Sequence, residues 1–588
     1  MPNLTLEQAL EMAWSAYQAG QLAEAESLAR QILRYQQTNV SAWQLVGLSR
    51  CQTGDLAEGF ASLQRAVQLE PGNADIRNNF ATALSRAGQL EPALVQLHEA
   101  IKLRPTFAEA YYNIANIDRD CGEYSQAMDG YRKAIQLKPD FPAAQNNLAN
   151  ALKDCGQVTE ALEIYRDLLA LHPDPRIGSN YVYSMHFEPD AGPRRLLIAH
   201  QQWNDDYAAA LTASAAPHDA ALFESDRKLR IGYVSPDFRN HPVGRFILPL
   251  LMNHDASRFE VSCYSDVMEP DSMTARLRAA VKNWHDTGHL NHEQLSEKIR
   301  GDQIDILVDL TMHMDGSRLL AFARKPAPIQ VTYLAYCSTT GMSAMDYRIS
   351  DWHLDPPGVD ESLYTERTVR LEHCYWCYVP PIETPALTPR MLGSTVFGCL
   401  NNFGKVNAGV ISTWSEILLK VEDSRLLLFA PSGDHRERAA GQFAAHGVDP
   451  ARIAFVGAQP ITEYMNVYQQ IDIALDPFPY PGGTTSCDAL WMGTPVVTLT
   501  GQTAVSRSGA SILKTIGLNE LVTESREGYV AKAISLARHP EKLAELRSVI
   551  RAKMQASTLM NAGLFAQNME AAFTEMSRNQ RKSSTKQG

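Results

Sequence analysis

A glycine returns every 34 residues in the first third of this chain, and no other feature constrains the fold as strongly. The positions are Gly20, Gly54, Gly88, Gly122 and Gly156. Prolines keep the same interval at Pro71, Pro105, Pro139 and Pro173. Glycine after a first helix and proline after a second predict paired helices at this period. We expect five helix-turn-helix units over residues 6–175, stacked into an α-solenoid because no unit buries its apolar face alone.

A helical pair of this length is the signature of the tetratricopeptide repeat, and stacked repeats form a concave surface that binds other proteins. Asn79, Asn113 and Asn147 occupy the same position in three consecutive repeats. Because an amide offers both a donor and an acceptor, such a ladder can hold an extended peptide without reading its sequence. The alternative is that asparagine packs well near the turn between the helices. We interpret the three residues as acceptor-binding.

Composition excludes several classes of function. The 588 residues carry a net charge of −12, which disfavours binding to nucleic acid or to an anionic membrane. No apolar run approaches the roughly 20 residues that span a bilayer. The start of the sequence has no basic segment followed by an apolar run, so we expect no secretory signal and a cytoplasmic location. Cys374 and Cys377 form a single CxxC without a second pair, so we predict neither a metal site nor a cofactor.

After residue 175 the repeat period lapses and the pattern changes. Residues 176–227 keep helical patterning and are predicted to form a helical connector. Short apolar strands then alternate with helical segments in two series, which we assign to two domains at residues 228–390 and 391–576. Alternating strands and helices predict parallel sheets, with a ligand cleft at the carboxyl ends of the strands. The polar residues 577–588 are predicted to be a disordered tail.

The segment Val234-Ser-Pro-Asp-Phe-Arg-Asn-His-Pro242 follows the first predicted strand of the first α/β domain. It places Asp237 and His241 at the mouth of the predicted cleft. A histidine there can accept a proton or hold a substrate hydroxyl. The alternative for a single histidine at a strand end is a structural role.

The segment Leu400-Asn-Asn-Phe-Gly-Lys405 follows the first strand of the second α/β domain. A lysine at a strand end in an acidic protein, beside the polar Asn401 and Asn402, suits a point charge on a diphosphate. A solvated surface lysine is the alternative, and the spacing alone does not decide between the two.

The strongest chemical signal is the run from Asp476 to Gly493, which reads DPFPYPGGTTSCDALWMG. Gly482 and Gly483 give a loop that lets backbone come close to a ligand. Thr484 and Thr485 then open a helix, whose free N–H groups and positive dipole end favour an anion. Asp488 is predicted to accept a hydrogen bond from a ribose hydroxyl or to cap the loop. The run predicts a phosphate cradle, and it lacks the lysine-serine pattern of a P-loop.

Together these segments resemble the protein O-linked glycosyltransferases of the SPINDLY and O-GlcNAc transferase group, glycosyltransferase family 41. The resemblance covers nearly the whole chain and rests on several dense motifs in the same order: the repeats, SNYVYSMHFEPD, RIGYVSPDFRNHP, DILVDLTMHMDGSRL, RKPAPIQVTYLAYCSTTGMSAMDYRISD, NNFGKVN and PYPGGTTSCDALWMGTPVVTL. It implies a GT-B fold of two Rossmann-like lobes, with the nucleotide sugar held by the C-terminal lobe. It also implies an inverting reaction without a metal, in which a serine or threonine of a protein reaches the cleft along the repeats.

The resemblance also implies roles for single residues. Lys405 matches the family lysine on the donor diphosphate, and Asn402 lies where animal relatives have a glutamine near it. Thr484, Thr485 and Asp488 match the Thr-Thr-x-x-Asp stretch that holds phosphates and ribose. Gly482 and Gly483, which precede them, are also assigned to donor binding. His241 matches the histidine long proposed as the base. His313 lies where many relatives carry a histidine, and we assign it to acceptor binding.

Two departures from the family leave the donor open. Gly483 replaces a histidine of the animal enzymes, and Ile461 and Tyr464 replace a lysine and a histidine near the nucleotide base. We expect UDP-GlcNAc as co-substrate, since contacts to the nucleotide base often come from backbone and tolerate side-chain change. GDP-fucose is the alternative because the GGTTSCDALWMG form is similar to the plant SPINDLY branch. A repeat scaffold with a degenerate catalytic domain is a third possibility. The sequence gives no oligomeric state.

Overall fold

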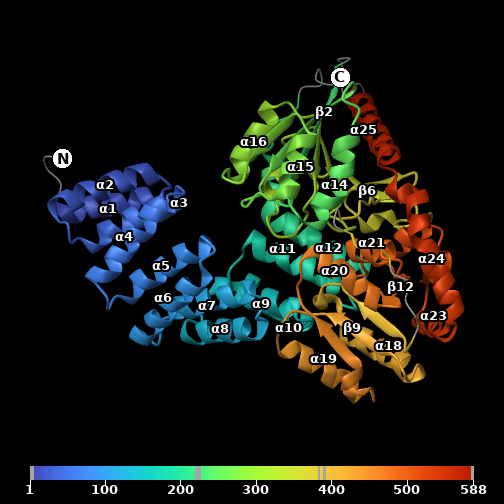
Figure 1. Ribbon diagram of the computed structural model, residues 1–588. Helices are drawn as coiled ribbons and strands as arrows, with labels where there is room; N and C mark the ends of the chain where they lie inside the picture. The colour runs from blue at the N-terminus through green and yellow to red at the C-terminus, as the bar shows by residue number, and fades with distance from the viewer. Residues whose placement is uncertain (1–4, 219–226, 382–383, 388–392, 585–588) are drawn as a thin grey trace. The chain divides into compact units, whose positions relative to one another are not determined.

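The computed structural model describes residues 5–218, 227–381, 384–387 and 393–584 (Figure 1). By its internal contacts the chain divides into two compact units, Met1–Ala151 and Leu152–Gly588. The first unit is helical throughout its described part, and the second contains both parallel sheets. This confirms the predicted order of an α-solenoid followed by two α/β lobes.

Five helix pairs account for the 34-residue period. They are α1 (Leu6–Gln18), α2 (Leu22–Tyr35), α3 (Val40–Gln52), α4 (Leu56–Leu69), α5 (Ala74–Arg86), α6 (Leu90–Leu103), α7 (Ala108–Asp120), α8 (Tyr124–Leu137), α9 (Pro142–Asp154) and α10 (Val158–Leu171). Each recurring glycine lies just after the first helix of its pair with a positive φ, from +73° at Gly88 to +91° at Gly54. Glycine adopts this left-handed conformation without steric cost, which explains the period.

The boundary between the two units lies inside α9, so the predicted repeat domain 6–175 extends over both units. The last helix α10 packs instead on the connector, where Leu162 meets Phe187 and Leu196 in one apolar cluster. The connector is helical as predicted, and its described elements are α11 (Pro175–Ser184), η1 (Met185–Phe187), α12 (Pro193–Trp203), the π-helical turn η2 (Asn204–Ala208) and α13 (Ala209–Ala213). Residues 219–226 of the predicted connector lie outside the described residues.

The first lobe is built on a parallel sheet of seven strands in the order β3-β2-β1-β4-β5-β6-β7. The strands are β1 (Leu229–Ser235), β2 (Phe259–Ser265), β3 (Asn283–Asp286), β4 (Ile306–Asp309), β5 (Ile329–Thr332), β6 (Tyr347–Asp351) and β7 (Arg367–Leu371). Its helices are α14 (Pro242–Asn253), α15 (Ser272–Ala280), α16 (His292–Gly301) and α17 (Leu319–Ala323).

The second lobe has a parallel sheet of six strands in the order β10-β9-β8-β11-β12-β13. The strands are β8 (Val396–Cys399), β9 (Arg425–Phe429), β10 (Ile453–Val456), β11 (Ile473–Leu475), β12 (Val496–Leu499) and β13 (Val522–Thr523). Its helices are α18 (Ala408–Lys420), α19 (Asp434–Ala445), α20 (Ile461–Val467), α21 (Thr484–Trp491), α22 (Ser508–Thr515), α23 (Arg526–Arg538) and α24 (Pro540–Ala556).

In both sheets the strand order reverses direction beside the first strand of the lobe. The reversal lies between β1 and β4 in the first lobe and between β8 and β11 in the second. Loops that leave such a pair of strands at their carboxyl ends diverge and open a crevice, which is where α/β sheets bind ligands. All the strand-end segments singled out in the sequence follow one of these four strands, so topology brings them to two crevices.

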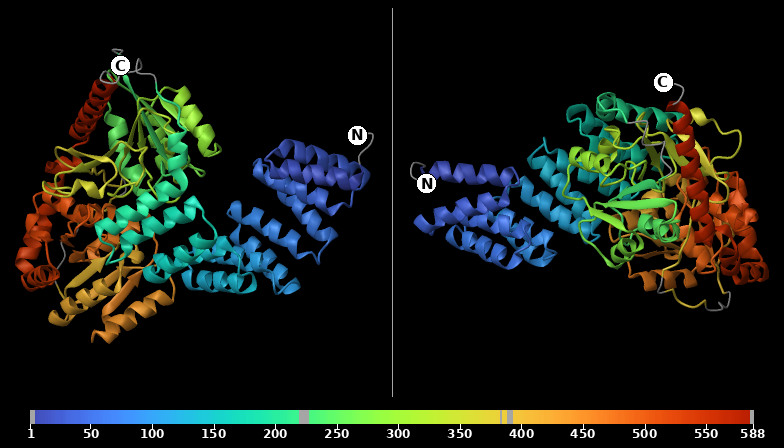
Figure 2. Two further views of the ribbon diagram at one scale, coloured as in Figure 1. Left: turned by 180° about the vertical axis from the view of Figure 1, so that it is seen from behind. Right: turned by 90° about the horizontal axis from the view of Figure 1, so that it is seen from above.

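The final helix corrects the prediction of a disordered tail. Residues 577–584 belong to α25 (Ala562–Ser584) and are not a disordered tail, while residues 585–588 lie outside the described residues. This helix also leaves the second lobe and packs on the first, as both Figure 1 and Figure 2 show. Glu570 accepts hydrogen bonds from the backbone N–H of Asp255 at 2.7 Å and pairs with His254 at 3.0 Å. The apolar face of Phe565, Met569 and Phe573 is buried, and this burial holds the polar end of the helix in place.

Candidate active site

Lys405 lies in the loop that follows β8, at the reversal point of the second sheet. The Asn402 side chain accepts a hydrogen bond from Gly404 N at 2.8 Å and so starts the short turn η5 (Phe403–Lys405). The Lys405 ammonium donates to Pro481 O at 3.0 Å and to Asn401 Oδ1 at 3.4 Å. Its burial lowers the pKa of Lys405 to about 8, against the opposing effect of the Asp476 carboxylate.

The predicted phosphate cradle follows β11, the strand beside β8. Its loop runs into α21, which begins at Thr484 without a side-chain cap. The Thr485 hydroxyl donates to Asn401 Oδ1 at 2.8 Å, so the cradle and the Lys405 loop share one acceptor. A Cβ at Gly482 would lie 2.5 Å from Thr485 Oγ1 and collide with Ser486 Oγ. Gly482 therefore has to be glycine because the hydroxyls of the next helical turn fold over it.

Asp476 anchors the loop from beneath. Its Oδ1 accepts hydrogen bonds from Gly482 N at 3.2 Å and from Ser486 Oγ at 2.8 Å. Burial raises the pKa of this carboxyl to about 6, despite those hydrogen bonds. Asp476 was not selected from the sequence as a site residue, and Asn401 was noted only as a polar neighbour of Lys405. Their positions directly after the adjacent strands β11 and β8 are the signal that identifies them.

Asp488, one turn into α21, is only 1% exposed. Its carboxylate accepts two hydrogen bonds from Arg245, at 2.6 and 3.1 Å, and one from the Tyr378 hydroxyl at 2.7 Å. Arg245 belongs to α14 of the first lobe, so this contact joins the two lobes. The predicted bond from Asp488 to a ribose hydroxyl stays a prediction, and the two partners of Asp488 were missed by the sequence analysis.

His241 caps the N-terminus of α14, directly after the loop that follows β1. Its Nδ1 accepts a hydrogen bond from Val243 N at 3.3 Å and lies 3.5 Å from the Asp237 carboxylate. Burial lowers the pKa of His241 below its usual value, with the charge of Asp237 opposing the shift. The imidazole is therefore neutral at pH 7. Arg245 N donates to His241 O at 3.0 Å, so α14 carries both the cap and the arginine that reaches Asp488.

The structure contradicts the predicted acceptor-binding role of His313. This residue is completely buried, and its two ring nitrogens pair with Ser179 Oγ at 3.0 Å and with Thr340 O at 2.9 Å. Its ring packs against Trp203 and His200. Burial lowers its pKa well below the usual value, with the nearby His200 contributing. A side chain with no exposed surface cannot meet an acceptor, so His313 holds the connector against the first lobe.

The asparagine ladder lies on α5, α7 and α9, the first helices of three repeats. Asn113 Nδ2 donates to Asn78 Oδ1 at 2.8 Å, and Asn147 Nδ2 donates to Asn116 Oδ1 at 2.9 Å. Each bond joins one repeat to the preceding one. For Asn113 and Asn147 this agrees with the alternative interpretation, in which the asparagines serve packing between helices. The three side chains of the ladder are partly exposed. Peptide binding by Asn79, Asn113 and Asn147 stays a prediction.

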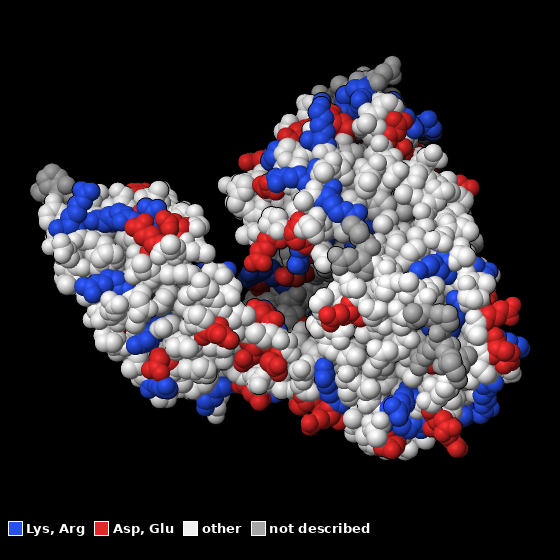
Figure 3. Space-filling view, viewed as in Figure 1, with Lys and Arg blue, Asp and Glu red and all other residues white. Residues whose placement is uncertain are grey.

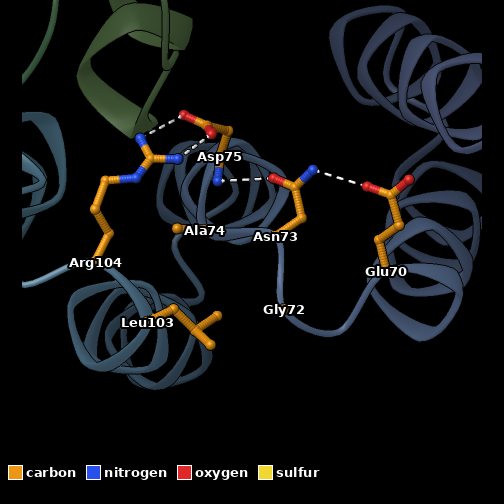
Figure 4. A pocket seen from close by; sticks show the side chains of 7 residues that line it. All are labelled: Glu70, Gly72, Asn73, Ala74, Asp75, Leu103 and Arg104. Carbon is orange, nitrogen blue, oxygen red and sulfur yellow. Dashed lines mark hydrogen bonds and ion pairs between the residues drawn. The ribbon is translucent and has the colours of Figure 1, made fainter.

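A hollow in the first unit, at the turn between the second and third repeats, has no ligand-binding geometry (Figure 4). The Asn73 side chain accepts from Asp75 N at 3.1 Å and donates to Glu70 at 2.8 Å, and Arg104 pairs with Asp75. These polar groups satisfy one another. The hollow is therefore a structural turn.

The part of the chain that the structure describes offers no other kind of site of the following two types. No group of three or more histidine, cysteine or acidic side chains in it could hold a metal ion. None of its helices has the length and apolar character needed to cross a bilayer. On the face shown in Figure 3, acidic and basic side chains are interspersed.

Known proteins share both parts of this arrangement. The model of glycosyl transferase family 41 matches residues 183–378 and 391–569, and tetratricopeptide repeat models match 10–74, 52–117, 115–154 and 143–172. The chain is 34% identical over 410 residues to a probable UDP-N-acetylglucosamine–peptide N-acetylglucosaminyltransferase SPINDLY of Petunia hybrida, covering 68% of this chain and 44% of the relative. The probable transferase SEC of Arabidopsis thaliana is 30% identical over 365 residues, covering 60% of this chain and 37% of the relative. The chain thus spans less than half the length of these curated relatives.

A solved structure agrees over most of the molecule. It is a lysine-to-methionine mutant of the Thermobaculum terrenum O-GlcNAc transferase, with a TM-score of 0.82 and 37% sequence identity. The match covers 87% of this chain and 98% of that one.

Proposed function

The chain belongs to glycosyltransferase family 41, and we propose that it is a protein O-glycosyltransferase that transfers GlcNAc from UDP-GlcNAc to serine or threonine hydroxyls. The observation that carries the proposal is the convergence of Lys405 and Thr485 on Asn401, at the reversal point of the second sheet. A cation, hydroxyls and a helix N-terminus in one crevice suit a diphosphate. The names of the relatives support the donor and the peptide acceptor.

In the proposed reaction the acceptor oxygen attacks the anomeric carbon of the sugar, and the bond from that carbon to the diphosphate oxygen breaks. The configuration inverts, and the nucleoside diphosphate leaves with the electron pair. Lys405, Thr484 and Thr485 stabilise the negative charge that develops on the leaving group. In this proposal they are positioned before the reaction, so little reorganisation is needed.

His241 is assigned to the acceptor side of the reaction. Because Nδ1 accepts the Val243 N–H, the neutral ring carries its proton on Nε2 and presents a donor there. In this tautomer His241 holds a substrate oxygen, and proton acceptance at Nε2 would require the other tautomer. The hydroxyl proton passes to solvent water with or after the attack.

GDP-fucose is the second candidate donor because Gly483 and Tyr464 depart from the animal enzymes. The Tyr464 hydroxyl hydrogen-bonds to that of Tyr468 at 2.9 Å, and Tyr468 in turn donates to Thr485 O at 3.0 Å. Tyrosine side chains thus occupy this side of the cradle, with Ile461 and Tyr464 in place of the lysine and histidine of the animal enzymes. In this second assignment the difference favours guanine over uracil as the nucleotide base of the donor. A cytoplasmic location and protein acceptors held by the repeats belong to the same proposal.

Parallel calorimetric titrations with UDP-GlcNAc and GDP-fucose test the donor. We expect saturable binding of UDP-GlcNAc that Lys405→Met weakens strongly. Selective binding of GDP-fucose would transfer the assignment to fucose. Binding of neither donor would favour a scaffold with a degenerate catalytic domain.

A further inference from the structure

Behind the candidate lysine lies a stack of aromatic rings with a second lysine at its far end. Lys405 Nζ lies 4.1 Å from the centre of the Tyr480 ring. The Tyr480 ring packs on Phe187, with their centres 5.1 Å apart. Phe187 packs edge-on against Tyr183 at 5.3 Å, and both rings lie near Lys153 Nζ, at 5.7 and 5.4 Å.

The second lysine is held firmly. Lys153 is 13% exposed at its side chain and forms an ion pair with Asp154 at 3.0 Å. The backbone of this turn also contacts the Lys405 loop directly, because a Cβ on Gly404 would lie 2.6 Å from Lys153 O. On the other side, a Cβ on Gly156 would lie 3.2 Å from Val406 O. The end of α9, the ring stack and the Lys405 loop therefore form one packed body within the second unit.

The choice of an aromatic partner has a chemical consequence for Lys405. An ammonium has three N–H donors, and two of those of Lys405 are used on Pro481 and Asn401. A carboxylate at hydrogen-bond distance would compete with an incoming diphosphate for the same cation. A ring face stabilises the cation through its quadrupole and carries no net charge that the diphosphate has to displace.

We propose that Tyr480 is a positioning residue that holds Lys405 ready for the donor diphosphate, and that Phe187 and Lys153 fix Tyr480 in that place. The inference rests on the proposed function, because it concerns the same donor site. It adds residues of the connector and of the last turn of α9 to the support of that site. The coupled elements are β8, the cradle loop and the C-terminal end of the repeats.

The primary test removes the ring and then restores it. In the full-length protein, Tyr480→Leu should raise the dissociation constant for UDP by about 3- to 30-fold, the range of a buried cation–π contact. Tyr480→Phe keeps the ring and should stay within about threefold of the wild type. Phe259→Leu is the matched control, because it removes a buried ring beside Arg258 (5.2 Å) at a distant edge of the first lobe.

The alkaline limb of UDP binding gives a readout that a purely structural role would not move. Removing the ring should shift this limb to lower pH, because the charged form of Lys405 loses a stabilising partner. Asp476 and Cys399 also face this ammonium and are unchanged in the variant. An alkaline limb that stays in place, together with unchanged UDP affinity in Tyr480→Leu, would overturn the proposal.

A double-mutant cycle tests the far end of the stack. Phe187→Leu and Tyr480→Leu should show non-additive effects on UDP affinity, because each acts through the same ring contact. Lys153→Met, which keeps most of the stem, should weaken UDP binding in the same direction. Additive effects in the cycle would exclude the role of Phe187. If the wild type binds neither UDP nor UDP-GlcNAc, the proposed function itself fails. If the wild type binds UDP and Tyr480→Leu binds it with the same affinity and the same pH dependence, only the positioning role is overturned.

Discussion

Arg245 and Asp488 form a two-point ion pair that joins the helix behind His241 to the helix of the phosphate cradle. The side chains are 12% and 1% exposed, and the shorter of the two contacts is 2.6 Å. Tyr378 donates a third hydrogen bond to the same carboxylate at 2.7 Å. A buried ion pair with little access to water thus fixes the position of one lobe against the other.

Removing Arg245 should be costly because it leaves a buried carboxylate short of partners. We expect Arg245→Met to lower the free energy of unfolding by about 3–5 kcal/mol, measured as a lower midpoint in thermal or urea denaturation. The double variant Arg245→Met/Asp488→Asn should recover most of this loss. If the double variant is stable yet does not bind UDP-GlcNAc, Asp488 also contacts the donor. A stable single variant would contradict the account of the pair.

The two neighbouring glycines of the cradle should respond differently to alanine. Gly482→Ala forces a methyl group against Thr485 and Ser486, so donor affinity should fall by at least tenfold as the hydroxyls are displaced. At Gly483 the added Cβ would lie 3.4 Å from the Trp376 ring, a contact the structure accommodates. Gly483→Ala should therefore bind the donor within about threefold of the wild type. Calorimetry on both variants checks this, and equal losses would show that the loop does not depend on close packing at Gly482.

Donor binding should weaken as the pH rises through about 8, where the Lys405 ammonium loses its proton. The sign follows from burial, which disfavours the charged form and lowers the pKa of this lysine. Below that pH the cation is present and binding is at its maximum. Lys405→Arg carries a permanent charge, so the alkaline limb of kcat/KM should disappear even if the overall rate is reduced. A limb that persists at the same pH in this variant would assign the titration to another group.

His241 has two separable roles, as a helix cap and as a substrate contact. His241→Ala should lose both, lowering kcat by about 10²–10³-fold through loss of a positioned donor and stability by about 1 kcal/mol. His241→Asn keeps a side-chain acceptor for the helix N-terminus and should recover stability without recovering kcat. Measuring kcat alongside the thermal midpoint separates the two effects. Near-normal turnover by His241→Asn would reduce this residue to a cap.

Repetition and strand-end position made much of the fold predictable. The glycine period gave the helix pairs because each glycine takes a left-handed conformation that other residues avoid. The apolar strands β1, β5 and β10 were visible as short hydrophobic runs. Strand β6 has no such run, because Arg348 and Asp351 look like surface residues. In the structure β6 is buried along its whole length, with Arg348 paired to Asp355 at 2.7 Å.

The candidate site was predictable where one motif held it and not where the tertiary fold assembled it. Lys405 and Thr485 could be selected because each lies in a loop or helix start shortly after an apolar strand, where a lysine or a threonine pair suits a phosphate. Arg245 and Tyr378 come from distant segments, and no local pattern links either of them to Asp488. His313 shows the opposite error, since the resemblance assigned it to acceptor binding while packing placed it in the core.

The central claim is transfer of a sugar from a nucleotide donor to a protein hydroxyl with the help of Lys405. Incubating the purified full chain with UDP-GlcNAc and a library of serine- and threonine-containing peptides, followed by mass spectrometry, tests it most directly. The account predicts a single N-acetylhexosamine on hydroxyl side chains, with UDP released in equal amount, and none with Lys405→Met. Unmodified peptides with intact UDP-GlcNAc, or equal modification by the wild type and Lys405→Met, would contradict it.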